Sequence, residues 1–203
     1  MIEASPVRLS GDSSSKEVIM TMTEVEIPGY ITGIWSIDPV HSYVGFVIRH
    51  AMLANVRGQF ESINGEIVTD HEILESRVDV TIDAASFHTN NEIRNQHIRS
   101  ADFLDADNFP SLSFTSTGIR LEDGFLIEGD LTIKGVTKSV VLRATTPRFG
   151  PNQEEKMSVG VSAHAMITRS EFGIDFNMPM GAGGFLLGDD VEVLLDIEGN
   201  LEA

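Results

Sequence analysis

Hydrophobic and polar residues alternate with a period of two along most of the chain after about residue 35. In residues 76–83, Val78, Val80 and Ile82 share one face, and charged or hydroxyl side chains occupy the other. The same alternation recurs over residues 125–133, 157–167 and 191–201. Successive side chains of a strand point to opposite faces, so this pattern predicts strands with one buried and one solvated face. Roughly eight such strands are typical of an antiparallel barrel or sandwich.

Short turn signals separate the predicted strands. Dipeptides that tolerate positive φ angles form tight turns, and the chain has Asn64-Gly65, Asp123-Gly124 and Lys134-Gly135 at such places. The alternation over residues 112–121 changes phase near Gly118, which predicts a β-bulge. These signals favour hairpins, and therefore an antiparallel sheet.

One segment, residues 87–110, interrupts the alternation and contains the predicted helix. Asn90 or Asn91 is a suitable N-cap for a short helix that runs to Ile98. Phe109-Pro110 ends the segment, because the residue before proline disfavours helical geometry. We therefore expect an all-β, eight-stranded antiparallel barrel with one short crossover helix segment.

The first 33 residues differ from the rest of the chain. They begin with a serine-rich polar stretch and continue through a possible strand over residues 17–25. We predict an N-terminal extension over residues 1–33 and a barrel domain over residues 34–203. The extra strand could cover a barrel edge or support a homodimer.

Composition narrows the class of function. With a formal net charge of -17, the chain lacks the excess of Lys and Arg that nucleic-acid binding requires. Without cysteine, it has no disulfides, thiolate metal ligands or cysteine nucleophile. No window approaches ~20 apolar residues, so we expect no stable membrane insertion. The chain begins without the basic start and apolar block of a secretory leader, which predicts a cytoplasmic protein.

No catalytic or metal-binding pattern stands out in the sequence. The six histidines have no metal-ligand spacing, and His164 falls on the polar face of its predicted strand. The glycine-rich residues 181–184 lack the lysine and the following helix of a phosphate loop. We therefore predict no catalytic residue, no metal site and no cofactor.

Hydrophobic side chains are abundant enough to form a large interior. An eight-stranded barrel has room either to fill itself with side chains or to hold one ligand. The candidate lumen residues, some on strands and some on connections, are Val44, Phe46, Ile48, Phe60, Phe103, Phe109, Phe114, Leu131, Ile133, Phe172, Phe176 and Phe185.

Five ordered blocks of sequence carry a further signal. The most specific are Trp35-Ser36-Ile37-Asp38 with His41-Ser42, a middle block from Thr89 through Arg94 and His97 to Phe109-Pro110, and Leu131 to Lys138. The set is completed by Val56 to Phe60 with Gly65 to Asp70, and by a last block of Ile167, Arg169-Ser170, Phe172-Gly173 and Gly188 to Val193. Together they cover about residues 33 to 202, and they resemble the YceI-like family of polyisoprenoid-binding proteins.

The resemblance implies a lipocalin-like barrel whose lumen takes a long isoprenoid chain, such as that of a polyprenyl phosphate or an isoprenoid quinone. It implies binding, storage or transport of this lipid, without known catalysis. Polar residues at the mouth would meet the head group, and the candidates are His50, Arg94, His97 and Arg99, since arginine suits phosphate and histidine can donate to a carbonyl. Arg99 could instead tie down the helix with Asp102. Asn95 departs from the family, which often has an acid there.

Two other functions remain open at this point. The protein could be an enzyme that acts on an apolar substrate in the lumen, with His50 or His97 as general base. It could also be a structural or stress-related protein with a filled barrel. In that case, shortening Phe46 or Phe114 would cost ~3–5 kcal/mol of stability and affect no binding.

Overall fold

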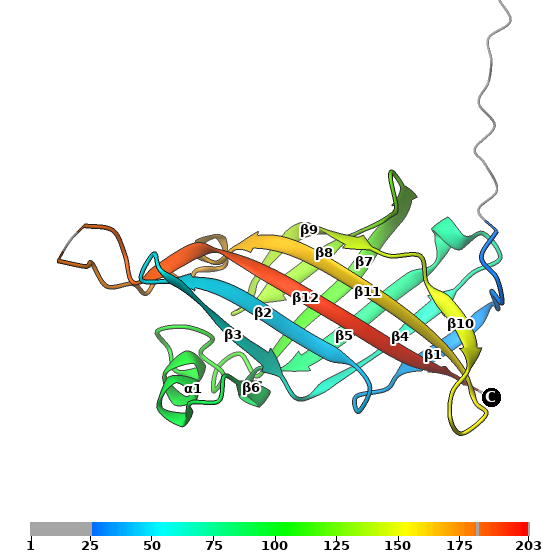
Figure 1. Cartoon of the computed structure of the whole chain (residues 1–203), viewed down its shortest axis with the longest axis horizontal. Coiled ribbons are helices and arrows are strands. Elements are labelled where there is room, and N and C mark those ends of the chain that lie inside the picture. Colours follow the sequence, from blue (N-terminus) through cyan, green and yellow to red (C-terminus); the bar gives the residue numbers. More distant parts are fainter. Residues whose placement is uncertain (1–25, 182, 203) are drawn as a thin grey trace, which may run out of the picture.

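The computed structural model describes residues 26–181 and 183–202, and these form one twelve-stranded antiparallel sheet with a single α-helix (Figure 1). The strands are β1 (Gly33–Ile37), β2 (Tyr43–His50), β3 (Ala54–Phe60), β4 (Ile63–Thr69), β5 (Arg77–Asp83), β6 (Phe87–His88), β7 (Ser111–Leu121), β8 (Phe125–Ile133), β9 (Val136–Ala144), β10 (Arg148–Pro151), β11 (Met157–Thr168) and β12 (Leu187–Leu201). The helices are α1 (Glu92–Arg99) and the short 3₁₀ helices η1 (Ile73–Glu75), η2 (Ala84–Ser86) and η3 (Arg169–Phe172).

Eight of the strands close into an antiparallel barrel. Their order is β11-β9-β8-β7-β5-β4-β1-β12, and β12 pairs with β11 to complete the ring. This last pairing runs from Ser158 opposite Asn200 to Thr168 opposite Asp190. Strands β2, β3 and β6 continue the sheet from β12, while β10 pairs with β11. The predicted all-β, eight-stranded barrel with one helix is confirmed.

The alternation of the sequence sets which side chains face the interior. On β11, Ala163, Ala165 and Ile167 line the internal cavity, whereas His164 is exposed between them. On β5, Val78, Val80 and Ile82 line the same cavity. The predicted inner faces of both strands, and the solvated position of His164, are confirmed.

Two predicted turns and the predicted bulge are also present. Lys134 and Gly135 have φ angles of 50° and 74° between β8 and β9, where Ile133 pairs with Val136. Asp123-Gly124, likewise with positive φ at both residues, connects β7 to β8. The register of these two strands shifts between Ser116 and Gly118. These turns make β7, β8 and β9 a continuous meander.

The prediction of a turn at Asn64-Gly65 is wrong. Both residues lie inside β4, where Asn64 pairs with Thr81 of β5, and β3 and β4 are not neighbours in the sheet. A Cβ atom on Gly65 would overlap the carbonyl oxygen of Asp79 on β5. Glycine is needed here because two strands approach closely, which is the other common reason for a glycine in a strand.

The helix begins where its cap predicts. The side chain of Asn91 accepts a hydrogen bond from the backbone N–H of Arg94 at 3.0 Å, as an N-cap does. The helix ends at Arg99, before Ser100. Within residues 26–181 and 183–202, every helix is too short or too polar to cross a membrane.

The end of the barrel near β10 and the last residues of β12 (Figure 1) is the one that we call the closed end. Aromatic side chains pack inside it. Trp35 is completely buried, and its ring centroid lies 5.3 Å from that of Phe149. Tyr30 packs edge-on against the same ring, and Ile27 is buried beside them. Residues 26–32 therefore pack against the barrel, whereas the strand expected over residues 17–25 lies outside the described residues.

Candidate functional site

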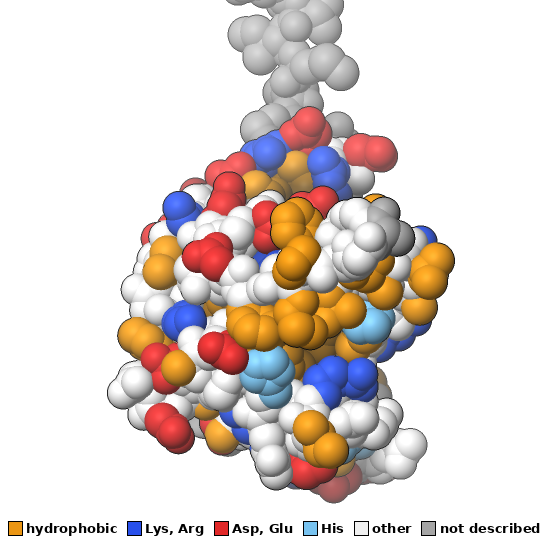
Figure 2. Space-filling view, turned by 90° about the vertical axis from the view of Figure 1, so that its left-hand side faces the viewer, with side chains coloured by type: hydrophobic (Ala, Val, Ile, Leu, Met, Phe, Trp, Pro, Cys, Tyr) orange, Lys and Arg blue, Asp and Glu red, His pale blue; other side chains and the backbone are white. Residues whose placement is uncertain are grey.

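The barrel encloses a cavity of about 380 Å³, a volume in the range of small-molecule sites. Its opening is bordered by α1, the turn between β2 and β3, and the segment 173–186; we call this end the mouth. Figure 2 looks at this face and shows hydrophobic side chains inside the hollow, with histidine and Lys or Arg side chains at its edge. Among the described residues, the polar side chains of the lining are His50, Thr89, Arg94, His97 and Arg169.

The strands build the rest of the lining from apolar side chains. All but two of the predicted lumen residues are part of it, namely Val44, Phe46, Ile48, Phe60, Phe103, Phe114, Leu131, Ile133, Phe172 and Phe176. Their neighbours on β11 are Ala163 and Ala165, whose small side chains leave space in the middle of the barrel. The interior is therefore hollow near the mouth and in the middle, and is not a filled core along its whole length.

Phe109 and Phe185 do not line the cavity. Phe109 packs on the turn between β8 and β9, where a Cβ atom on Gly135 would meet its ring. Phe185 is 59% exposed in the segment that precedes β12. Both residues lie on connections, and the period-two rule that orients side chains on strands does not apply there.

Three of the four predicted mouth residues, His50, Arg94 and His97, line the cavity. Arg99 lies outside the lining, and its Nη2 donates to the backbone oxygen of Phe87 at 2.7 Å. Its Nη1 lies 3.8 Å from a carboxylate oxygen of Glu92. Arg99 thus ties α1 to β6, and Asp102, its expected partner, pairs with His97.

A buried hydrogen-bond network holds Arg94 at the mouth. Its Nε donates to Thr89 Oγ1 at 2.8 Å, and its Nη2 donates to the backbone oxygen of Thr89 at 2.7 Å. Asn95, which is 1% exposed, accepts hydrogen bonds from both the N–H and the hydroxyl of Thr89. At the position where the family often has an acid, this chain thus has a neutral acceptor that orients Thr89.

His97 forms the outer edge of an aromatic cluster. Its ring lies edge-on to Phe103 and Phe176, with centroid distances of 5.1 and 4.9 Å. Its Nε2 lies 2.9 Å from Asp102 Oδ2 at the surface. The ring therefore has one side toward the apolar mouth and one nitrogen toward a solvated carboxylate.

Arg169, like Thr89, is a polar residue of this site that the sequence reasoning missed. It is 6% exposed and borders the cavity. Its Nε donates to Gly188 O at 2.9 Å, and its Nη1 donates to Ile174 O and Phe176 O. The signal was available, because the phase of Ala165 and Ile167 continues to Arg169 and so turns an arginine inward.

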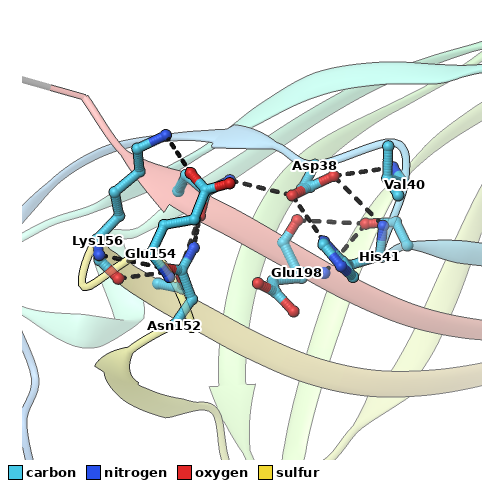
Figure 3. A network of polar contacts seen from close by, with 10 residues as sticks. Asp38, Val40, His41, Asn152, Glu154, Lys156 and Glu198 are labelled. Atoms are coloured by element: carbon cyan, nitrogen blue, oxygen red, sulfur yellow. Dashed lines mark hydrogen bonds and ion pairs between the residues drawn. The ribbon is translucent and has the colours of Figure 1, made fainter.

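A second polar cluster joins the β1–β2 turn, β12 and residues 152–156 (Figure 3). His41 Nδ1 lies 2.9 Å from Asp38 Oδ2, and Asp38 also accepts from the N–H of Val40 and from Asn200 Nδ2. The hydrogen bond from His41 is the main reason that the pKa of Asp38 falls to about 2, and Asp38 in turn raises the pKa of His41. A carboxylate oxygen of Asp38, a ring nitrogen of His41 and a carboxylate oxygen of Glu198 lie within 4.8 Å of one another.

Comparisons with known proteins agree with this fold. The YceI-like domain model matches residues 35–199. A UPF0312 protein of Photorhabdus laumondii is 30% identical over 178 residues, which cover 87% of this chain and 84% of that protein.

Two solved structures have the same fold. Burkholderia cenocepacia BcnA aligns with a TM-score of 0.67 and 23% identity, over 80% of this chain and 98% of that one. A polyisoprenoid binding domain from Saccharophagus degradans aligns with a TM-score of 0.61 and 14% identity, over 85% of this chain and 100% of that one. The fold, the sequence blocks and the family model lead to one conclusion: this chain belongs to the YceI-like family.

Proposed function

We propose that this protein binds a long-chain isoprenoid lipid, with the chain in the barrel cavity and the head group at the mouth, and so stores or transports it. One observation carries the proposal. The cavity is lined by apolar side chains, and its polar side chains come from elements that adjoin the mouth: His50 ends β2, Thr89, Arg94 and His97 lie just before or within α1, and Arg169 begins η3. A lipid has the same division between an apolar chain and one polar end.

Burial of the chain supplies the affinity. Removing apolar surface from water contributes roughly 25 cal/mol per Å². The lining comes mostly from hydrogen-bonded strands of the closed barrel, and a site on a rigid scaffold loses less conformational entropy when it binds. The Saccharophagus degradans protein, which is described as a polyisoprenoid binding domain, has the same fold and supports the choice of ligand class.

Arg94 and Arg169 favour a head group that accepts hydrogen bonds. Among the described residues, Nη1 of Arg94 and Nη2 of Arg169 have no hydrogen-bond acceptor. A phosphate binds arginine through paired oxygens, and a quinone carbonyl accepts a single hydrogen bond. Polyprenyl phosphate and isoprenoid quinone are therefore the two candidates, and both leave the chain in the cavity.

The proposal is tested by extracting natively purified protein with organic solvent and identifying the lipid by mass spectrometry. Ala165→Trp fills the cavity, whereas Met166→Trp places the same ring outside, because Met166 is the next residue of β11 and is 64% exposed. We expect an isoprenoid lipid in the wild type and in Met166→Trp, and little in Ala165→Trp. A wild type that contains no such lipid and takes up neither added polyprenyl phosphate nor added quinone would contradict the proposal.

A further inference from the structure

Large apolar side chains are exposed around the mouth. Met52 and Leu53, in the turn between β2 and β3, are 63% and 83% exposed. Met178 and Phe185, in the segment that precedes β12, are 49% and 59% exposed. We call residues 51–53 and 178–186 the rim, without the undescribed residue 182. The rim borders the opening, since its Met178 and Leu186 line the cavity.

The two parts of the rim lie side by side. The N–H of Ala51 donates to Leu186 O at 2.7 Å, and a Cβ atom on Gly184 would lie 3.7 Å from Met52 Cγ. Figure 1 shows both parts at the same end of the barrel, where β2 ends and β12 begins. The exposed apolar side chains thus belong to one surface at the opening.

Acidic residues are absent from the sequence of both segments. The chain has 31 Asp and Glu residues, yet none from Pro39 to Phe60, and residues 176–188 contain no charged residue of either sign. Arg49 lies beside the turn, and its Nη2 donates to Met52 O. Burying a carboxylate in hydrocarbon is costly, so a surface that enters a lipid layer must lack acids.

We propose that the rim docks on the surface of a zwitterionic lipid bilayer, with Leu53, Met52 and Phe185 among the acyl chains and Arg49 at the level of the lipid phosphates. Long cationic side chains commonly lie this way at a membrane interface. Because the rim borders the opening, docking lets an isoprenoid chain pass between bilayer and cavity without crossing water. The inference rests on the function proposed above and names the partner that delivers or receives the ligand.

The experiment measures partitioning of the full chain onto phosphatidylcholine vesicles by co-sedimentation. Leu53→Asp is compared with Val40→Asp, which makes the same change in charge at an equally exposed residue, 83% in both cases, in the turn between β1 and β2. We expect Leu53→Asp to weaken partitioning about tenfold and Val40→Asp to leave it unchanged. Phe185→Ser, which alters the other part of the rim without adding charge, is expected to weaken it several-fold.

Three results would overturn the inference: a wild type that does not bind the vesicles, equal partitioning of Leu53→Asp and wild type, or equal weakening by Val40→Asp. If the wild type instead forms a dimer in light scattering that Leu53→Asp disrupts, and it does not bind vesicles, the rim is a protein interface. Extraction of lipid from the same preparations separates the two proposals. If the wild type contains the lipid but does not bind vesicles, the docking proposal is wrong and the ligand proposal still holds.

Discussion

The two ends of the barrel are built from the same alternating strands, but the interior is packed at one end and hollow at the other. At the closed end, the inward side chains include Trp35 and Phe149, and the remaining space is about 70 Å³. Toward the mouth, β11 turns Ala163, Ala165 and Ile167 inward, two of them with small side chains, and the cavity reaches about 380 Å³. Alternation decides which residues face inward, and their volume decides whether the interior is a core or a site.

The ends also differ in how they hold their polar groups. The closed end satisfies them among themselves, as when Trp35 Nε1 donates to Thr69 Oγ1 at 2.8 Å. At the mouth, Arg94 and Arg169 use part of each guanidinium to fix the backbone. The closed end, with its polar groups paired, gives the barrel a rigid base. The mouth keeps guanidinium N–H groups that can donate to a ligand.

The largest expected effect is at the closed end. Trp35→Ala removes a completely buried ring and leaves a cavity, so we expect a loss of about 3–5 kcal/mol in the free energy of unfolding. Urea unfolding followed by circular dichroism measures it. Val40→Ala, at an exposed residue near this end, should change stability by less than about 0.5 kcal/mol. A small effect of Trp35→Ala would mean that the closed end is not the stabilising part of the barrel.

A somewhat smaller effect is expected from Arg169 at the mouth. Arg169→Met removes charge-assisted hydrogen bonds to Gly188, Ile174 and Phe176, and should cost about 2–3 kcal/mol. It should also release residues 174–188, so limited proteolysis should cleave this segment faster than in the wild type. Unchanged proteolysis would show that the hydrogen bonds of Arg169 do not hold this segment in place.

The network around Thr89 gives the next effect. Asn95→Leu leaves the N–H and hydroxyl of Thr89 buried without their acceptor, and we expect a loss of about 1–2 kcal/mol. Gln96→Leu, at the adjacent exposed residue of α1, is the matched control and should be nearly neutral. If both variants unfold at the wild-type urea concentration, Asn95 does not organise the mouth.

The smallest effect is the pH dependence of the Asp38–His41 pair. The pKa of His41 is raised above its ordinary value of 6.5 in the folded protein, so its stabilisation is fully present below 6.5 and is lost as pH rises through the folded pKa. Asp38, with its pKa lowered from 3.8 to about 2, loses its contribution only as pH falls toward 2. The melting temperatures of the wild type and His41→Ala should therefore differ more at about pH 5 than at about pH 9. A difference that grows with pH would contradict this assignment.

Much of the candidate site could be predicted from the sequence where side chains lie on strands. Phe46, Phe114 and Leu131 are in the cavity because each follows the inward phase of its own strand. Phe109 and Phe185 could not be placed this way, since connections have no fixed period. Arg169 lay within reach of the same rule, because it continues the phase of β11.

What the sequence by itself determined is local: the period of two, the tight turns at Asp123-Gly124 and Lys134-Gly135, and the cap at Asn91. What only the tertiary structure decided depends on which strands become neighbours. Gly65 is a glycine because β5 passes close by, and Arg99 and Arg169 differ in role because of the backbone oxygens that each one meets. Short-range preferences act through adjacent residues, whereas a cavity and its mouth arise from contacts between residues far apart in the chain.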